Sequence, residues 1–290
     1  MPNLKDIQRK IAAVGKTRQI TKAMYMVASS KLRGVEARME SFRPYATKFA
    51  EVLGNLANGI EPDIHPLLQK KERVKRIDLL HFSADRGLCG SFNSNLIIRA
   101  TKWIEEQKSK GIECSVTTVG KKGTGFFGKG KYNLLKSYSN VYKDVNISFV
   151  NQMTRFFIDR YMDDEVDEVY MMYSNFVNVA KHEPTLLKLI PVEPPMKDKQ
   201  EVVSEYLCEP DPESLMIELL PKHISVQILN AFLQTETSEH AARMAAMDKA
   251  AKNCGEMIEE LTLAYNKARQ AAITAELMDI VGGAEALKAA

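Results

Sequence analysis

The sequence lacks the long hydrophobic run that a membrane-spanning helix needs. No stretch between charged residues is longer than thirteen residues, and the longest one covers residues 223–235. A helix needs about 20 predominantly apolar residues to cross a bilayer. The first residues, Met-Pro-Asn-Leu, do not resemble a signal or transit peptide. These absences argue against a chain with membrane-spanning helices and against a secreted one.

Cysteine is also scarce, and it does not occur in pairs. The four cysteines show no CxxC spacing, and the five histidines show no HxxxH or HExxH spacing. We therefore expect free thiols, a reducing compartment and no metal site. His81, in a predicted strand, and His240, on a helical seam, are interpreted as structural.

Proline and glycine are nearly missing from the carboxy-terminal part. Between Lys222 and Val281 there is no proline, and Gly255 is the only glycine. A helix of about 60 residues is about 90 Å long. A compact chain of 290 residues has a diameter of only about 50 Å. The sequence therefore predicts a helix that extends beyond a globular body and needs a partner to cover it.

The net charge of +3 implies no polyanionic partner, but the charges are unevenly placed. Residues 1–33 contain eight Lys or Arg and one acid, whereas residues 222–290 contain seven basic and nine acidic residues. A basic helix could bind nucleic acid, as in a coiled-coil adaptor. Because aromatic residues are not interleaved with these cations, we favour an acidic protein surface as the partner.

Both ends of the chain carry a heptad pattern. Alternate steps of four and three select eleven positions at the amino end, nine of them apolar or small: Ile7, Ile11, Val14, Arg18, Thr21, Tyr25, Ala28, Leu32, Val35, Met39 and Phe42. The same steps at the other end select Met244, Met247, Ala251, Cys254, Ile258, Leu261, Tyr265, Ala268, Ala272 and Ala275. We predict an antiparallel coiled coil between the two ends; the alternative is that each seam packs on a separate core. Pro44 is expected to kink or end the first helix, with a second helix reaching about Asn58.

The middle of the chain alternates strand-like and helix-like segments. Strands are expected at 77–82, 115–119, 166–177 and 186–192, and helices at 92–110, opened by Asn93 or Ser94, and 148–162. This alternation predicts an α/β, Rossmann-like domain with a largely parallel sheet. The predicted division is an amino-terminal coiled-coil helix (1–58), a central α/β domain (59–221) and a carboxy-terminal coiled-coil helix (222–290). Residues 191–212 hold five prolines and are expected to form a loop or an edge hairpin.

Two local patterns could carry chemistry. Gly123, Gly125 and Gly128 match GxGxxG after a predicted strand, which allows a nucleotide-binding α/β protein as the alternative function. That motif needs a helix starting within the glycines, and the residues after 130 favour an irregular segment, so a flexible glycine loop is the preferred interpretation. The acidic residues at 163–168 are interpreted as a solvated turn between a helix and a strand. No local Ser–His–Asp or Cys–His set is present.

Several segments together resemble the gamma subunit of F-type ATP synthases, of the bacterial type. They cover the chain in the order expected for that family: ITKAMYMVASSK (20–31), SADRGLCG (83–90), YLCEPDP (206–212), SEHAARM (238–244), YNKARQAAITAE (265–276) and IVGG (280–283).

The resemblance implies a central rotor shaft that couples proton flow through a membrane ring to ATP synthesis or hydrolysis. The implied partners are three alpha and three beta subunits, one epsilon subunit and the ring of c subunits, with one copy of this chain per complex. Catalysis would lie in the partner subunits, so no cofactor and no nucleic acid are expected. The implied location is peripheral, on the cytoplasmic face of the bacterial inner membrane.

The resemblance also implies three sets of contact residues. Contacts with beta and alpha are implied for Met24, Lys31, Arg33, Arg86, Cys89, Arg243, Arg269, Gln270 and Thr274. A foot on epsilon and the c-ring is implied for Tyr206 and Glu209. The end of the last helix is apolar on more than one side, which suits a bearing that turns without fixed partners: Ile273, Leu277, Ile280 and Val281.

Overall fold

The computed structural model describes residues 4–57, 62–143, 145–193, 208 and 211–289. Its helices are α1 (Leu4–Ala57), α2 (Phe92–Ser109), α3 (Lys121–Phe127), α4 (Ile147–Met162) and α5 (Pro212–Ala289), with short 3₁₀ turns η1 (Pro62–Ile64), η2 (Pro66–Leu68) and η3 (Val141–Lys143). The strands are β1 (Arg76–Phe82), β2 (Glu113–Val119), β3 (Asn133–Tyr138), β4 (Glu168–Asn178) and β5 (Lys181–Ile190).

Helix α5 begins earlier than the predicted residue 222. The first helix does not end at Pro44, because α1 continues through it for a total of 54 residues. An internal proline costs a helix about 3 kcal/mol, and the burial of Met39 before it and Leu53 after it opposes that cost. The last helix, α5, has 78 residues and contains Pro221. It starts at Pro212, where the Asp211 carboxylate accepts a hydrogen bond from the backbone N–H of Ser214 at 2.8 Å.

The chain forms two compact units. One combines residues 1–28 with 244–290, and the other contains residues 29–243. Residues 29–57 of α1 and 212–243 of α5, called the inner halves of these helices, therefore belong to the same unit as the α/β core. This division differs from the one expected at residues 58 and 222, because the apolar faces of these inner halves pack on the sheet layer.

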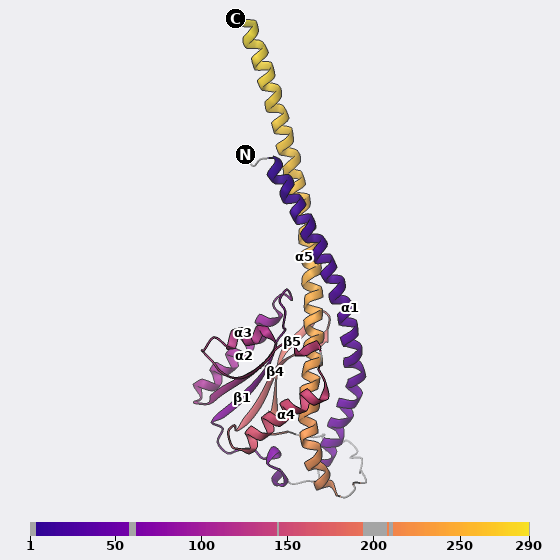
Figure 1. Ribbon diagram of the computed structural model, residues 1–290, viewed down its shortest axis with the longest axis vertical. Helices are drawn as coiled ribbons and strands as arrows, with labels where there is room; N and C mark the ends of the chain where they lie inside the picture. The colour runs from indigo at the N-terminus through magenta and orange to yellow at the C-terminus, as the bar shows by residue number, and fades with distance from the viewer. Residues whose placement is uncertain (1–3, 58–61, 144, 194–207, 209–210, 290) are drawn as a thin grey trace, which may run out of the picture. The chain divides into compact units, whose positions relative to one another are not determined.

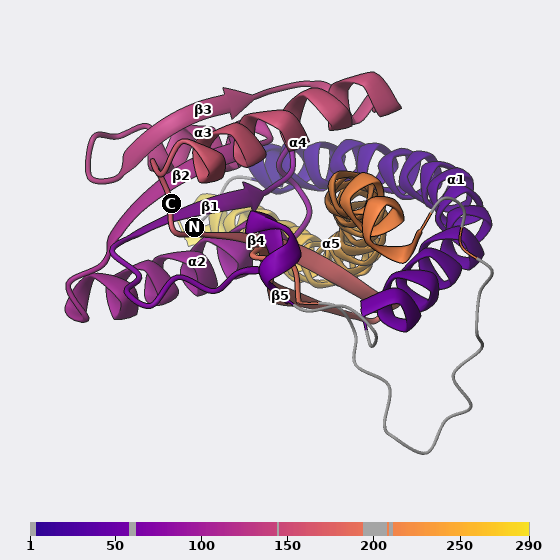
Figure 2. The same ribbon diagram turned by 90° about the horizontal axis from the view of Figure 1, so that it is seen from below.

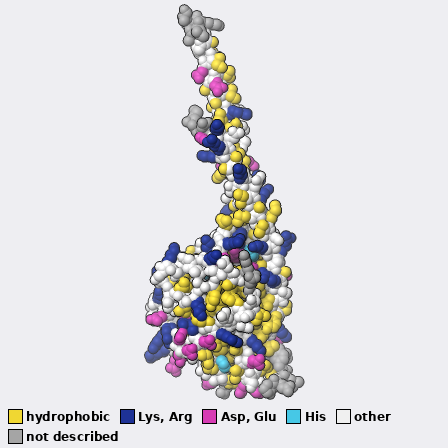
Figure 3. Space-filling model, in the orientation of Figure 1, with side chains coloured by type: hydrophobic (Ala, Val, Ile, Leu, Met, Phe, Trp, Pro, Cys, Tyr) yellow, Lys and Arg dark blue, Asp and Glu magenta, His cyan; other side chains and the backbone are white. Residues whose placement is uncertain are grey.

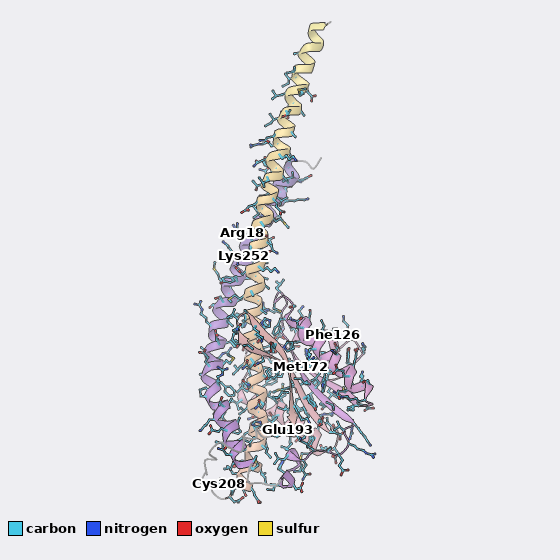
Figure 4. The ribbon with its side chains drawn as sticks, turned by 180° about the vertical axis from the view of Figure 1, so that it is seen from behind. Arg18, Phe126, Met172, Glu193, Cys208 and Lys252 are labelled. Atoms are coloured by element: carbon cyan, nitrogen blue, oxygen red, sulfur yellow. The ribbon has the colours of Figure 1, made fainter. Side chains whose placement is uncertain are left out.

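The first unit is the predicted antiparallel coiled coil. In α1 the seam residues Ile7, Thr21 and Ala28 are buried. The Arg18 guanidinium lies 3.6 Å from the position that a Cβ on Gly255 would take, and Figure 4 shows Arg18 near Lys252 of the partner helix. Between residues 252 and 284 the half-buried residues are those of the predicted seam, with Gly255: Cys254, Gly255, Ile258, Leu261, Tyr265, Ala268 and Ala272.

The second unit contains a five-stranded sheet of order β3-β2-β1-β4-β5. Strands β3, β2, β1 and β4 pair in parallel with one another, and β5 is antiparallel to β4. The predicted α/β class is therefore confirmed. Strand β3 falls where an irregular segment was expected, because its pairing with β2 is a long-range contact that local sequence does not reveal.

Helices cover both faces of the sheet (Figure 2). Leu79 and Val116 belong to a core with Phe92, Leu96 and other residues of α2 and α3, and Met172 of β4 lies in the same core (Figure 4). Leu80 and Phe82 point to the opposite face, where α4, α5 and the end of α1 close a larger core. Phe82 meets Phe232 of α5 edge-on, with ring centroids 4.9 Å apart. The long helix is thus an integral layer of the α/β unit.

Candidate functional site

The distal segment of α5 (residues 273–284, called the tip) is exposed on all sides in the described structure. In the coiled-coil unit, α5 continues beyond the first residue of α1 (Figure 1). The predicted bearing residues are large, apolar and exposed: Ile273 49%, Leu277 57%, Ile280 68% and Val281 54%. Met278 adds another exposed side chain at 68%. Figure 3 shows hydrophobic side chains along this part of the helix.

A polar belt, formed by Arg269, Gln270 and Thr274, lies just before the tip and at its start. Arg269 and Gln270 are exposed, and neither side chain forms a hydrogen bond or ion pair with the described residues. The hydroxyl of Thr274 donates to the backbone carbonyl of Gln270 at 2.9 Å. The belt therefore presents one guanidinium and one amide to solvent, next to the apolar tip.

The predicted contact residues of α1 differ in exposure. In the coiled-coil unit, Met24 is half-buried, and Ile20 and Val27 beside it are exposed at 60% and 57%. In the α/β unit, Lys31 and Arg33 are exposed. The apolar pair Ile20 and Val27 was missed by the sequence reasoning, although its spacing of seven residues places both on one helix face.

The loop after β1 does not present all the residues expected of it. Arg86 is exposed, but Cys89 is only 2% exposed. The Cys89 sulfur accepts a hydrogen bond from the Asn93 side-chain amide at 3.1 Å, and burial raises the pKa of its thiol. The thiol is therefore placed to hold the loop, whereas Arg86 and Leu88, exposed at 64%, form its outer surface.

Arg243 lies inside the α/β unit and contacts the same loop. Its side chain is 11% exposed and forms an ion pair with Glu239. It also donates a hydrogen bond to the backbone carbonyl of Gly87 at 3.1 Å. The expected contact of Arg243 with a partner stays a prediction, while within the chain its side chain is largely buried. What the structure shows is a clamp that fixes the loop after β1 to α5.

The clamp continues into a network of charges along α5. Glu236 forms an ion pair with Arg38 of α1 at 3.2 Å, and Glu239 lies 3.0 Å from the Nδ1 atom of His240. Burial raises the pKa of Glu236. Burial also acts to raise the pKa of Glu239, but its interactions with His240 and Arg243 outweigh that effect and lower it. Helix α5 is thereby joined to α1 on one side and to the loop after β1 on the other.

The glycine run proves to be a packing feature. Helix α3 starts within the glycines, contrary to the expected flexible loop. Gly120 has φ +95, and a Cβ there would lie 2.0 Å from the Ser83 carbonyl oxygen. The first amides of α3 are already occupied: those of Lys121, Lys122 and Gly123 donate to groups of Asp85, Ala84 and Ser83. No amides remain there to bind a phosphate, so the nucleotide alternative loses its support.

Helix α5 also occupies the usual ligand crevice of this fold. In sheets of this topology, ligands bind at the carboxyl ends of the strands, where the strand order reverses; here that point lies between β1 and β4. The pairing of β1 with β4 ends at Met172. Beyond it, the amide of Phe176 donates to the Gln234 side-chain oxygen at 2.9 Å, and the amide of Ser174 donates to the Thr235 hydroxyl at 3.4 Å. Helix α5 thus takes the position that a ligand would need.

The acidic residues at 163–168 are more ordered than the predicted solvated turn. Asp167 is 6% exposed and accepts hydrogen bonds from the amides of Lys75 and Arg76 at 2.7 and 2.9 Å. Although burial acts in the opposite direction, these bonds and Lys71 lower the pKa of Asp167. Its neighbours form ion pairs with Lys71, Arg160 and Lys188. The cluster is therefore a structural network.

Three further expectations concern the whole chain. The four cysteines form no disulfide in the described structure. Among the described residues, no group of His, Cys, Asp and Glu could hold a metal ion, and no helix is both long and apolar enough to span a membrane. Tyr206 and Glu209, the expected foot, lie outside the described residues.

The sequence matches one family over nearly its full length. A family model described as ATP synthase matches residues 3–287. The chain is 47% identical over 291 residues to the ATP synthase gamma chain of Maridesulfovibrio salexigens, covering 99% of this chain and 100% of the relative. It is 49% identical over 297 residues to the ATP synthase gamma chain of Desulfosudis oleivorans, with the same coverage.

Solved structures share the fold. A chain of the Euglena gracilis mitochondrial ATP synthase rotor aligns with a TM-score of 0.67 at 19% identity, covering 93% of this chain and 98% of that chain. A chain of the central stalk and c-ring of the Tetrahymena thermophila mitochondrial ATP synthase aligns with a TM-score of 0.60 at 23% identity, covering 80% and 99%. At these identities the likeness establishes the fold, and the family is established by the relatives.

Proposed function

Since the chain belongs to the family of ATP synthase gamma chains, we propose that it is the central rotor shaft of a bacterial ATP synthase. In this role it transmits rotation between a proton-driven membrane ring and the catalytic sites of partner subunits. The proposed partners are three alpha and three beta subunits, an epsilon subunit and the c-ring. The chain itself performs no catalytic step, and its position is peripheral, on the cytoplasmic face of the inner membrane.

The exposed apolar tip is the observation that carries this proposal. Five large apolar side chains between Ile273 and Val281 are at least 49% exposed. Soluble monomers rarely expose contiguous apolar surface of this kind without a partner. A sleeve formed by other subunits would cover the tip and remove it from water.

The chemistry of the tip suits rotation within such a sleeve. Dispersion contacts between apolar groups are weak individually and have little directional preference. Hydrogen bonds to charged groups contribute about 1.5–3 kcal/mol each and depend on geometry. A tip rich in such bonds would favour one orientation strongly, whereas an apolar tip turns with small barriers. Arg269 and Gln270, just below it, can instead define preferred angular positions.

Exposed cations on α1 support a second type of contact. Lys31 and Arg33 are exposed, and their attraction to acidic partner loops falls slowly with distance. Such attraction persists while the partner loop moves past the helix. We therefore propose that Lys31 and Arg33 in the α/β unit, and separately Met24 in the coiled-coil unit, meet acidic loops of the beta subunits.

Reconstitution tests the proposal directly. Purified alpha and beta subunits are mixed with the chain, and ATP hydrolysis is measured together with the mass of the complex. We expect the chain alone to hydrolyse no ATP, and the mixture to form one complex with a single copy of the chain and high ATPase activity. If the three components form no complex, the proposal is wrong.

A further inference from the structure

Leu88 adopts a backbone conformation that leucine rarely takes. Three non-glycine residues of the described chain have positive φ: Leu88 at 62°, Asn140 at 61° and Asp164 at 54°. Asn and Asp tolerate this left-handed region because their short polar side chains bond locally, whereas leucine meets a steric penalty there. Glycines stand nearby at Gly87 and Gly90, yet the strained position itself carries a leucine.

The loop around Leu88 is fixed on both sides. Before it, the Gly87 carbonyl accepts the hydrogen bond from Arg243. After it, Cys89 is buried against Asn93. Strain of this kind persists only where the surroundings determine the conformation. The result is that the Leu88 side chain is 64% exposed, and the described fold does not need it for its core.

Three cations lie on the loop or on the start of α3 beside it. Arg86 and Lys121 are exposed, and the Lys122 ammonium lies 3.6 Å from the position of a Cβ on Gly87. The carboxylate of Asp85 is engaged, since it accepts hydrogen bonds from the amides of Lys121 and Asn140. The loop therefore presents one exposed apolar group in a segment with more cations (Arg86, Lys121 and Lys122) than acids (Asp85). A single leucine buries too little area to anchor a protein on a lipid surface, so this chemistry fits a protein partner.

We propose that Leu88 is a strained apolar anchor that inserts into an apolar hollow with an acidic rim on a partner subunit. The conformation lowers the stability of the free chain and gains contact area in the complex. The proposal rests on the proposed function, because the partner is a component of the assembled ATP synthase. It differs from the contact expected of Cys89, whose thiol faces the interior.

The test combines two measurements on Leu88→Asn, which tolerates left-handed backbone and removes the apolar group. Thermal unfolding of the full chain should show a midpoint raised by about 2–4 °C, because the strain is relieved. Titration of the chain into alpha and beta subunits should show at least about tenfold weaker assembly. Leu88→Met keeps an apolar anchor and should assemble like the wild type.

Ile98→Gln is the matched control, because Ile98 is exposed to a similar extent at 63% but lies on regular helix α2. It should neither raise the midpoint nor weaken assembly. If wild type and Leu88→Asn assemble with equal affinity, or if Leu88→Asn lowers the midpoint, the anchor proposal is overturned and the proposed function stands. If the wild-type chain itself does not assemble, the proposed function fails and the anchor with it.

Discussion

Helix α5 has two parts with opposite surface chemistry. Within the α/β unit, its residues from Gln234 to Arg243 bond to β4, to α1 and to the loop after β1, and most are buried. Within the coiled-coil unit, the helix shows a narrow seam of apolar or small residues and then an apolar tip that the described residues leave exposed. The part of α5 in the α/β unit is thus bonded to the rest of that unit, whereas the end of α5 in the coiled-coil unit remains exposed for partners. Hydrogen bonds and ion pairs suit the part of the helix that must transmit force to the α/β unit. An apolar surface without such bonds suits the part that must turn against a partner.

The largest expected contrast is between two apolar residues of α5. Phe232 is 1% exposed in the larger core, and Leu277 is 57% exposed on the tip. Phe232→Ala should lower the free energy of unfolding by about 3–5 kcal/mol, because it leaves a cavity. Leu277→Ala should change it by less than about 0.5 kcal/mol. Urea unfolding of both variants measures this, and equal losses would show that the tip is covered within the chain.

Acid should lower the stability of the α/β unit, called the body below, and should leave that of the coiled-coil unit unchanged. His81 is completely buried, and burial lowers its pKa to about 4. The native fold favours the neutral ring, so its contribution is complete above the unfolded pKa of about 6.5 and is lost as the pH falls from there towards the folded value. By pH 5 the loss is about 2 kcal/mol. The coiled-coil unit, residues 1–28 and 244–290, contains no histidine.

Trp103 fluorescence during urea unfolding at pH 7 and pH 5 measures this loss in the body, since the single tryptophan lies in α2. Hydrogen exchange of the amides at 250–268 measures the coiled coil at the same two pH values. The variant His81→Leu should reduce the pH dependence of the body. Equal pH dependence in the variant and the wild type would contradict the assignment to His81.

Two arginines of α5 provide a third contrast. Arg243→Ala leaves the buried carboxylate of Glu239 without one of its partners, and we expect a loss of about 2–3 kcal/mol. Arg269→Ala removes an exposed side chain and should change stability by less than about 0.5 kcal/mol. In the reconstituted complex the order should reverse, with Arg269→Ala giving the larger change in ATPase rate per assembled complex. Stability and ATPase losses that follow the same order would refute this separation.

The smallest effect is expected from two glycines, and its sign should differ between the units. At Gly255 in the coiled coil, a Cβ would meet Arg18 at an ordinary 3.6 Å. Gly255→Ala should stabilise the helix by about 0.5–1 kcal/mol. At Gly123 in the body, a Cβ would lie 2.9 Å from both His81 and Ser83. Gly123→Ala should therefore lower the melting temperature, whereas Gly255→Ala should raise it.

The elements that sequence predicted best are those with regular periodicity. The two seams are visible because a coiled coil selects apolar residues at fixed steps, and the half-buried positions from Cys254 to Ala272 follow those steps. Strand β1 could also be predicted, because most of its residues are apolar. Its two interior polar residues, Asp78 and His81, are buried with the others. In the two seams and in β1, the residues that the local sequence pattern marks as apolar are those that the fold buries.

The features that the sequence did not reveal depend on long-range contacts. Continuation through Pro44 follows from packing on both sides of it, and β3 follows from its pairing with β2. The burial of Cys89 and Arg243 depends on the meeting of two segments more than 150 residues apart, as the 156-residue separation of Gly87 and Arg243 shows. The i, i+4 spacing of Glu239 and Arg243 could have indicated their ion pair. The left-handed backbone of Leu88 has no signal in the sequence.

Single-molecule rotation tests the central claim most directly. A probe is attached through Lys102→Cys, an exposed position on α2, after the half-buried Cys208 and Cys254 are replaced by serine. The alpha and beta subunits of the reconstituted complex are fixed to a surface, and ATP is added. The account predicts that the probe rotates continuously in one direction relative to the fixed subunits. ATP hydrolysis by the complex with a stationary probe would contradict it.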